Sequence, residues 1–371
     1  MAWNDIIGQT RVKSLLERLW ESGRMPHAML FHGPAGSGKD AIAIELARTL
    51  NCERGAWEPC GVCQSCARMA ALRHPRFRMV FALPSKPQEK TPTDKFSDAE
   101  MEEFNRQIEL KAENPYHRFA MGKAAGIKIS SIRDVKQESA FRGARGGRTV
   151  VLISEAERMN DSAANALLKT LEEPTGDLLL ILTTSKRDAL LPTILSRCQQ
   201  IRFDLLHLNE LRDGLQRLFD IPAEKAAHAA LLANGSVAEA LELSSEEMLI
   251  PRPEIYEYLK DVYKGAPTQL MKRVKKYAEV EDKKALALFL NGVAGWFRDV
   301  LVVHEGAPER IRSTDLRVPI EKFAASFPDA RCEEAVEAIE TTIEMIQKNV
   351  HLVTALIVLS HRIRRCMTPG A

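Results

Sequence analysis

The sequence has 371 residues, with 52 Lys and Arg against 50 Asp and Glu, so its formal net charge is +2. A chain of this length builds two or three domains, while a nearly neutral charge offers no global attraction to nucleic acid or to an anionic membrane. No window approaches the roughly 18 apolar residues of a membrane span, and the amphipathic start does not resemble a signal peptide. We therefore expect a cytoplasmic, multi-domain protein and disfavour a free-standing DNA-binding protein.

Short apolar runs alternate with helical patterns over the first half of the chain. Helical periodicity covers residues 11–22, 41–50 and 162–174, and the apolar runs cover residues 27–33, 149–157 and 178–185. Strands that alternate with helices in this way predict an α/β fold with a parallel sheet. Residues 84–126 interrupt the pattern with a Pro- and Lys-rich opening and a highly charged helix, which predicts a surface insertion.

Strand patterns stop at about residue 206, and the remaining chain is helical in pattern. We expect three domains: an α/β domain over residues 1–206, a small helical lid over residues 207–248 and an all-α domain over residues 249–371. The polar, Pro-containing stretch SSEEMLIPRPE is the expected hinge before the last domain.

Four cysteines follow one another with C-x7-C-x2-C-x2-C spacing in a loop over residues 52–66: Cys52, Cys60, Cys63 and Cys66. Two-residue gaps let thiolates converge on one ion, and four thiolates complete the closed tetrahedral shell of a structural Zn²⁺ site. Iron–sulfur ligation also uses paired C-x2-C spacings, and four ordinary buried thiols are the plain alternative. We expect structural zinc.

The stretch GPAGSGKD, residues 33–40, follows the phosphate-binding pattern G-x-x-x-x-G-K-[ST] except at its last position. Gly33, Gly36, Gly38 and Lys39 are present, and the backbone of such a loop cradles phosphate at a helix N-terminus. Asp40 replaces the hydroxyl that holds Mg²⁺ and brings a negative charge to the place of a triphosphate. ATP and Mg²⁺ binding are therefore doubtful.

The strand predicted over residues 149–157 contains a second departure from a working ATPase. A working site places Asp and then Glu here, to position Mg²⁺ and to orient the attacking water, whereas this chain has Ser154 and Glu155. Glu155 remains a residual base. Either hydrolysis has been lost, or Asp40 and Ser154 have exchanged places around one Mg²⁺.

Four segments occur in an order that resembles the clamp-loader AAA+ family of bacterial DNA polymerase III: WNDIIGQTRVKSLLERLWESGRMPHAMLFHGPAGSGKD, the cysteine loop, NALLKTLEEPTGDLLLILTTS and LPTILSRCQQIRF. The resemblance covers residues 1 to about 245, apart from the insertion. It implies a RecA-like AAA+ P-loop domain, a helical lid and a helical collar. The collar assembles five subunits into a ring that opens the sliding clamp and loads it at primer–template junctions.

The resemblance also assigns roles to two further positions. Catalytic members carry an arginine in a lid helix where this chain has Ala238, within NGSVAEAL, and they extend an arginine finger to a neighbour's ATP at the position of Arg197. With three catalytic positions altered and Arg197 kept, we expect a stator-like subunit that is no enzyme by itself but belongs to the polymerase assembly. An alternative for Arg197 is a local salt bridge or helix cap.

The competing hypothesis is an ATP-hydrolysing gamma/tau-type subunit, in which Asp40 is an unusual Mg²⁺ ligand. Ala238 and Ser154 speak against it, as does the ending of this sequence close to the collar helices, which predicts no tau-type extension. The expected partners are the other ring subunits and, through the complex, the sliding clamp and primer–template DNA, with no membrane.

Arginines and glycines alternate in FRGARGGR, near the end of the segment that follows the insertion. Arg142, Arg145 and Arg148 are candidates for contact with nucleic-acid phosphates, because such contacts need charge and little geometry. A solvated loop explains the same pattern.

Overall fold

The computed structural model describes residues 2–86, 91–122, 124–133, 147–173, 177–244, 252–265, 267–278, 283–311, 313, 316–347 and 350–368. The chain forms two compact units, Met1–Leu241 and Glu242–Ala371, which are described separately below. Among the described residues, no helix is long and apolar enough to cross a membrane.

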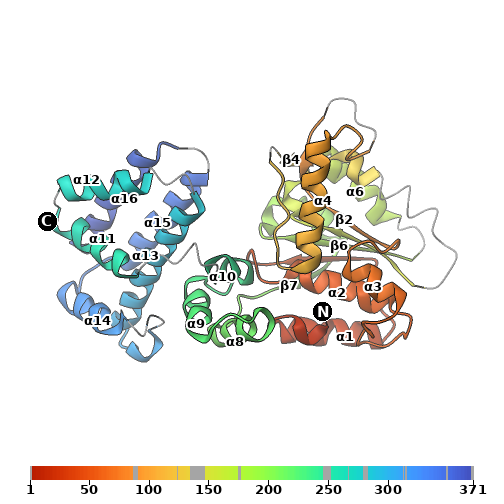
Figure 1. The fold of residues 1–371 in the computed structure, drawn as a ribbon, viewed down its shortest axis with the longest axis horizontal. Helices are drawn as coiled ribbons and strands as arrows, with labels where there is room; N and C mark the ends of the chain where they lie inside the picture. The colour runs from red at the N-terminus through yellow and green to blue at the C-terminus, as the bar shows by residue number, and fades with distance from the viewer. Residues whose placement is uncertain are drawn as a thin grey trace. The chain divides into compact units, whose positions relative to one another are not determined.

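A five-stranded parallel sheet forms the centre of the first unit (Figure 1). Its strands, in spatial order, are β2 (Phe77–Val80), β5 (Thr149–Ile153), β6 (Leu178–Thr184), β1 (Ala28–His32) and β7 (Gln199–Arg202). All four pairings are parallel, so the carboxyl ends of β1, β5 and β6 meet at one edge. The predicted α/β fold with a parallel sheet is confirmed, and the three predicted strands are the three central ones.

Helices cover both faces of this sheet because side chains of a strand alternate between faces. On β6, Leu179 and Ile181 join a core with α1 (Thr10–Glu21) and α2 (Lys39–Asn51). The alternate β6 residues Leu178, Leu180 and Leu182 join a second core. That core includes α6 (Asp161–Glu172) and α7 (Pro192–Leu195). The central strands are buried on both sides, as their unbroken apolar runs predict.

The insertion contains α4 (Asp98–Glu113), which begins at a capping box formed by Ser97 and Glu100. Two short strands, β3 (Leu83–Pro84) and β4 (Ala124–Gly126), pair antiparallel where the insertion leaves and rejoins the sheet domain. The structure differs here from the expected surface insertion, because Lys111 is only 3% exposed and Tyr116 only 6%. Most exposed positions of α4 carry charged residues, whereas Lys111 in its last turn is buried.

Further helices of the first unit lie in the cysteine region and in the lid. A small helix, α3 (Gln64–Ala70), lies within the cysteine region. The lid helices are α8 (Leu208–Phe219), α9 (Ala223–Leu232) and α10 (Val237–Ser244). Contacts group the lid with the sheet domain up to Leu241.

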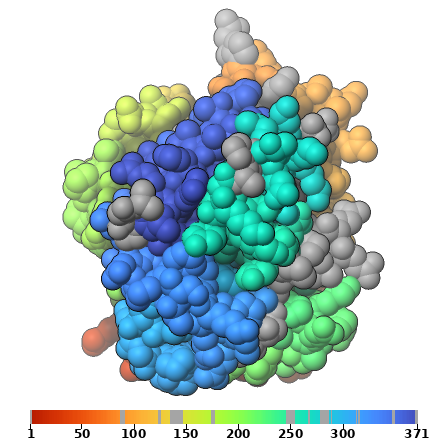
Figure 2. All heavy atoms as spheres, turned by 90° about the vertical axis from the view of Figure 1, so that its left-hand side faces the viewer, coloured from red at the N-terminus to blue at the C-terminus, as the bar shows by residue number. Residues whose placement is uncertain are grey.

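The second unit is helical throughout its described residues. Its helices are α11 (Arg252–Lys264), α12 (Pro267–Ala278), α13 (Lys283–His304), α14 (Arg317–Ser326), α15 (Cys332–Gln347) and α16 (Leu352–Met367). Their apolar faces share one core, in which Tyr258 and Ser360 form a buried hydrogen bond of 2.9 Å between their hydroxyl groups. Helices α11 and α12 pack beside α16, as the teal and dark blue surfaces in Figure 2 show. The predicted helical C-terminal region is confirmed.

Candidate nucleotide site and metal centre

The phosphate-binding loop lies between the end of β1 and the start of α2, at the carboxyl edge of the sheet. Gly38 is the N-cap residue of α2 and has a φ of 90°, a conformation that favours glycine. Gly36 also has a positive φ of 72°, and a Cβ there would collide with the Ser236 hydroxyl. The backbone geometry of an anion-binding loop is therefore retained.

Lys39 points back into its own loop. Its Nζ donates hydrogen bonds to the carbonyls of Gly33 (2.8 Å) and Pro34 (2.6 Å) and to the Ser37 hydroxyl (3.3 Å). Burial lowers the pKa of Lys39 to about 8, because an ammonium group loses hydration there. The lysine thus satisfies loop carbonyls.

Asp40 lies at the centre of a polar network that joins three parts of the sheet domain. Its Oδ2 accepts hydrogen bonds of 3.0 Å from Lys111 Nζ and 3.0 Å from Ser154 Oγ, and its Oδ1 accepts one of 2.8 Å from Thr183 Oγ1. Burial alone would raise the pKa of Asp40, but the Lys111 ammonium and these hydrogen bonds outweigh burial and hold it below its ordinary value. Asp40 is therefore ionised and already paired.

The Tyr116 ring lies next to the N-terminus of α2. Its Cε1 would be 3.3 Å from a Cβ placed on Gly38, and its hydroxyl accepts a 2.8 Å hydrogen bond from the Ile7 amide. Its ring meets the Phe219 ring of α8 edge-on, with centroids 6.4 Å apart. Burial raises the pKa of the Tyr116 phenol, so the hydroxyl is neutral.

Glu155 follows β5 and has a φ of 53°, a left-handed conformation that is unusual for this residue type. Its carboxylate pairs with Arg118 of the insertion (2.5 Å) and with Arg158 (3.3 Å). The expected residual base is thus near the site but occupied by two guanidinium groups.

The lid touches the phosphate-binding loop directly. The Val237 amide donates a 2.9 Å hydrogen bond to the Gly36 carbonyl, and α10 begins at this residue. Ala238 therefore stands in the first turn of α10, close to the loop. Its methyl group has no atom that can bind a phosphate.

Arg197 lies between α7 and β7, outside this network. Its guanidinium donates hydrogen bonds to Glu172 (2.8 Å) and to the Thr193 carbonyl (3.1 Å), and 35% of its side chain is exposed. Arg197 thus combines a local salt bridge with a partly exposed guanidinium group.

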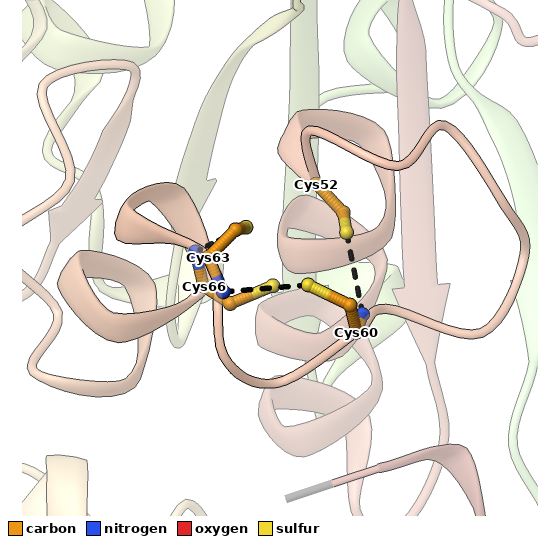
Figure 3. A group of neighbouring side chains, drawn as sticks. All are labelled: Cys52, Cys60, Cys63 and Cys66. Atoms are coloured by element: carbon orange, nitrogen blue, oxygen red, sulfur yellow. Dashed lines mark hydrogen bonds between the residues drawn. The ribbon is translucent and has the colours of Figure 1, made fainter.

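The four loop cysteines converge, as Figure 3 shows. The sulfur atoms of Cys52, Cys60, Cys63 and Cys66 all lie within 4.8 Å of one another. Four thiolates bound to one Zn²⁺ at about 2.3 Å have sulfur–sulfur distances of about 3.8 Å, so the cluster fits a tetrahedral ion. The cysteines come from the end of α2, the following loop and the start of α3.

The thiols of this cluster have unequal surroundings. Amide hydrogen bonds from Val62 and Cys63 lower the pKa of Cys60 to about 6, whereas burial raises the pKa of Cys66 to about 12. A bound cation favours the thiolate form of every ligand, so it offsets the cost of ionising the buried thiol.

Of the three arginines that are candidates for contact with nucleic acid, Arg148 is the one that lies among the described residues. Arg142 and Arg145 lie outside the described residues. The Arg148 guanidinium donates hydrogen bonds to the carbonyls of Met25 (3.3 Å) and Pro26 (2.8 Å), so it ties β5 to the segment before β1.

Comparison with known proteins shows the family of this chain. A family model described as "DNA polymerase III, delta subunit" matches residues 8–207. The chain is 28% identical over 355 residues to DNA polymerase III subunit delta' of Bacillus subtilis, covering 93% of this chain and 92% of the relative. It is 34% identical over 254 residues to the delta' subunit of Pseudomonas aeruginosa, covering 68% and 66%.

The chain is also 32% identical over 250 residues to the DNA polymerase III subunit tau of Escherichia coli, and the match covers 65% of this chain and 32% of that subunit. Among solved structures, the RuvB Holliday junction branch migration motor of Thermotoga maritima aligns with a TM-score of 0.40 and 16% identity, over 70% of this chain and 65% of that one. A gamma subunit-related protein of the same organism aligns with a TM-score of 0.37 and 16% identity, over 96% and 99%.

Proposed function

Because this chain belongs to the DNA polymerase III delta-subunit family of clamp-loader proteins, we propose that it is a delta-prime-type stator: a non-catalytic ring subunit that helps load the sliding clamp onto primed DNA. It works in the bacterial cytoplasm beside gamma/tau and delta subunits. The clamp and the primer–template are reached through the complex.

One observation carries the non-catalytic assignment: the ion pair between Asp40 and Lys111 at the start of α2. In a working site a hydroxyl at this position helps to hold Mg²⁺. Here a carboxylate stands in its place, and its cation is a lysine of the same chain. Rewiring around Mg²⁺, with Asp40 and Ser154 exchanged, requires displacing that lysine from a buried position.

Arg197 supports the second half of the proposal, the arginine finger donated to a neighbouring ATPase subunit. A guanidinium group stabilises charge on a transferring phosphoryl group. The exposed ion pair with Glu172 is worth only about 0–1 kcal/mol, so Arg197 leaves it at little cost when a phosphate is offered.

The cysteine cluster supports a structural zinc site. With four sulfur ligands the ion has no open position for water or substrate. The loop also carries Trp57, which stacks on Trp3 with centroids 4.4 Å apart. Zinc would thereby fasten α2, the loop and the N-terminal segment together.

The test is ATP turnover. The isolated full chain should not hydrolyse Mg-ATP, and steady turnover would favour the gamma/tau-type alternative. In the reconstituted complex, Arg197→Ala should remove the DNA-stimulated turnover of the one site it serves, because losing an arginine finger lowers a site's rate by about 10³-fold or more. Arg187→Ala, at a half-exposed arginine that follows β6, is the control. Unchanged turnover in Arg197→Ala would end the finger assignment.

A further inference from the structure

The insertion contacts the nucleotide site at three separate places: Asp40, the loop at Gly38, and Glu155. We propose that residues 98–121 are a built-in plug, which fills the space above the phosphate-binding loop and keeps nucleotide out of this subunit. The inference rests on the proposed non-catalytic function and deepens it, since it names the segment that closes the site.

The first contact pairs the carboxylate at the start of α2 with a cation of the insertion. Lys111 lies near the C-terminal end of α4, and its Nζ bonds both Asp40 and the His117 carbonyl, 2.7 Å away. The anion at the start of α2 is thus supplied by Asp40, and the matching cation by Lys111. A Mg²⁺ ion or a phosphate at this point would meet a carboxylate and an ammonium group that are already paired with each other.

The second contact fills volume. A phosphate held by the loop lies at the N-terminus of α2, and the rest of a nucleotide must extend from there. The Tyr116 ring occupies this position, between Gly38, the Ile7 amide and Phe219 of the lid helix α8. The tyrosine therefore bridges three walls of the site, as a ligand would.

The third contact engages Glu155. Arg118 lies two residues after Tyr116 and pairs with the carboxylate that would orient a water molecule. A single segment of eight residues, 111–118, thus reaches the metal-ligand position, the loop and the expected base.

The segment is held firmly in this position. Gln107 Oε1 lies 2.8 Å from His117 Nε2 and accepts a 3.2 Å hydrogen bond from the Ala120 amide. The Phe119 ring stacks on Phe81, with centroids 3.7 Å apart. In Figure 1, one end of α4 lies at α2. These contacts tie the turn to both α4 and the sheet domain.

The experiment titrates Mg-ATP calorimetrically into four full-length proteins: the wild type, Asp40→Thr, Asp40→Thr/Tyr116→Ala and Asp40→Thr/Tyr263→Ala. Threonine restores the loop hydroxyl, so the second and third proteins differ only in the tyrosine ring. Tyr263 is a tyrosine of the second unit with 48% exposure, and its truncation is the matched control. Circular dichroism checks that each variant is folded.

We expect Asp40→Thr/Tyr116→Ala to bind Mg-ATP at least about tenfold more tightly than Asp40→Thr, with the Tyr263 control behaving as Asp40→Thr does. Equal affinity with and without the Tyr116 ring, whether tight or undetectable, would overturn the plug. Failure of the non-catalytic function is a different result, turnover of Mg-ATP by the wild-type chain.

A second measurement needs no nucleotide. Tyr116→Phe removes the acceptor of the Ile7 amide, so hydrogen exchange at Ile7 should accelerate while the amides of the central strand β1 keep their rates. An unchanged rate at Ile7 would show that the tyrosine does not occupy the site, and it would also overturn the proposal.

Discussion

The ion pair between Asp40 and Lys111 gives a prediction that a double-mutant cycle can test. The two atoms are 3.0 Å apart, and the side chains of Lys111 and Asp40 are 3% and 23% exposed. At an effective dielectric constant near 20, attraction at this distance is about 5 kcal/mol. Part of it is offset by the desolvation of the buried lysine, so we expect a net coupling of about 2 kcal/mol.

Each single substitution leaves one buried charge without its partner. Lys111→Met leaves the Asp40 carboxylate with two hydroxyl donors, and Asp40→Asn leaves the ammonium with the His117 carbonyl. Breaking a buried pair costs about 3–5 kcal/mol, and the partial exposure of Asp40 places both variants near 3 kcal/mol. The double variant should be less destabilised than the sum of the two singles by the coupling energy.

Urea unfolding monitored by tryptophan fluorescence measures these free energies. The chain has four tryptophans, of which only Trp296 lies in the second unit, so a Trp296→Phe background reports on the first unit alone. A coupling below about 0.5 kcal/mol would refute the ion pair as described.

The same cycle has a pH signature. The pKa of Asp40 in the folded chain lies below the ordinary value of 3.8. Its stabilisation is therefore complete above the unfolded pKa and is lost as the pH falls through the lower, folded value. The advantage of the wild type over Asp40→Asn should be constant near neutral pH and should shrink only in acid.

Two further predictions concern buried groups of the first unit. Burial raises the pKa of Glu45 to about 7, above its ordinary 4.5, so the folded state holds a proton that the unfolded state releases, and stability should fall as the pH rises through this range. Glu45→Gln should flatten that slope in urea midpoints, and an unchanged slope would contradict the assignment. Metal analysis should find about one zinc per chain; Cys63→Ser should lose it, whereas Cys332→Ser in the second unit should keep it. A wild-type protein that contains no metal, and is as stable without zinc as with zinc added, would exclude the zinc site.

The central strands were predictable from sequence, but the outer ones were not. β1, β5 and β6 are buried on both faces and therefore read as unbroken apolar runs. The edge strands β2 (FRMV) and β7 (QQIR) each pair on one side only and contain charged or amide side chains. These two strands are defined by their hydrogen bonds to a neighbouring strand, and such pairing is not visible in a local sequence pattern.

Some features of the candidate site were likewise predictable from the sequence, and others were not. The cysteine cluster was predictable because its four cysteines are close in sequence and their spacing is typical of a metal site. The partner of Asp40 was not, since Lys111 lies 71 residues away on a helix whose other charges are mostly exposed. The weak signal was the stretch ENPYHRF at the end of α4, where aromatic residues follow a charged helix and suggest burial.

The identity of residue 40 cannot be judged apart from that of residue 111. A hydroxyl at position 40 would leave the buried Lys111 ammonium without a carboxylate, at a cost comparable to breaking the pair. An uncharged residue at position 111 would leave the Asp40 carboxylate without the ammonium that pairs with it. Each residue neutralises the buried charge of the other. The two together neutralise the site that a nucleotide would otherwise enter. When the last residue of a phosphate-binding pattern is changed, the pattern alone therefore does not predict nucleotide binding. The side chain that faces the changed residue must also be known.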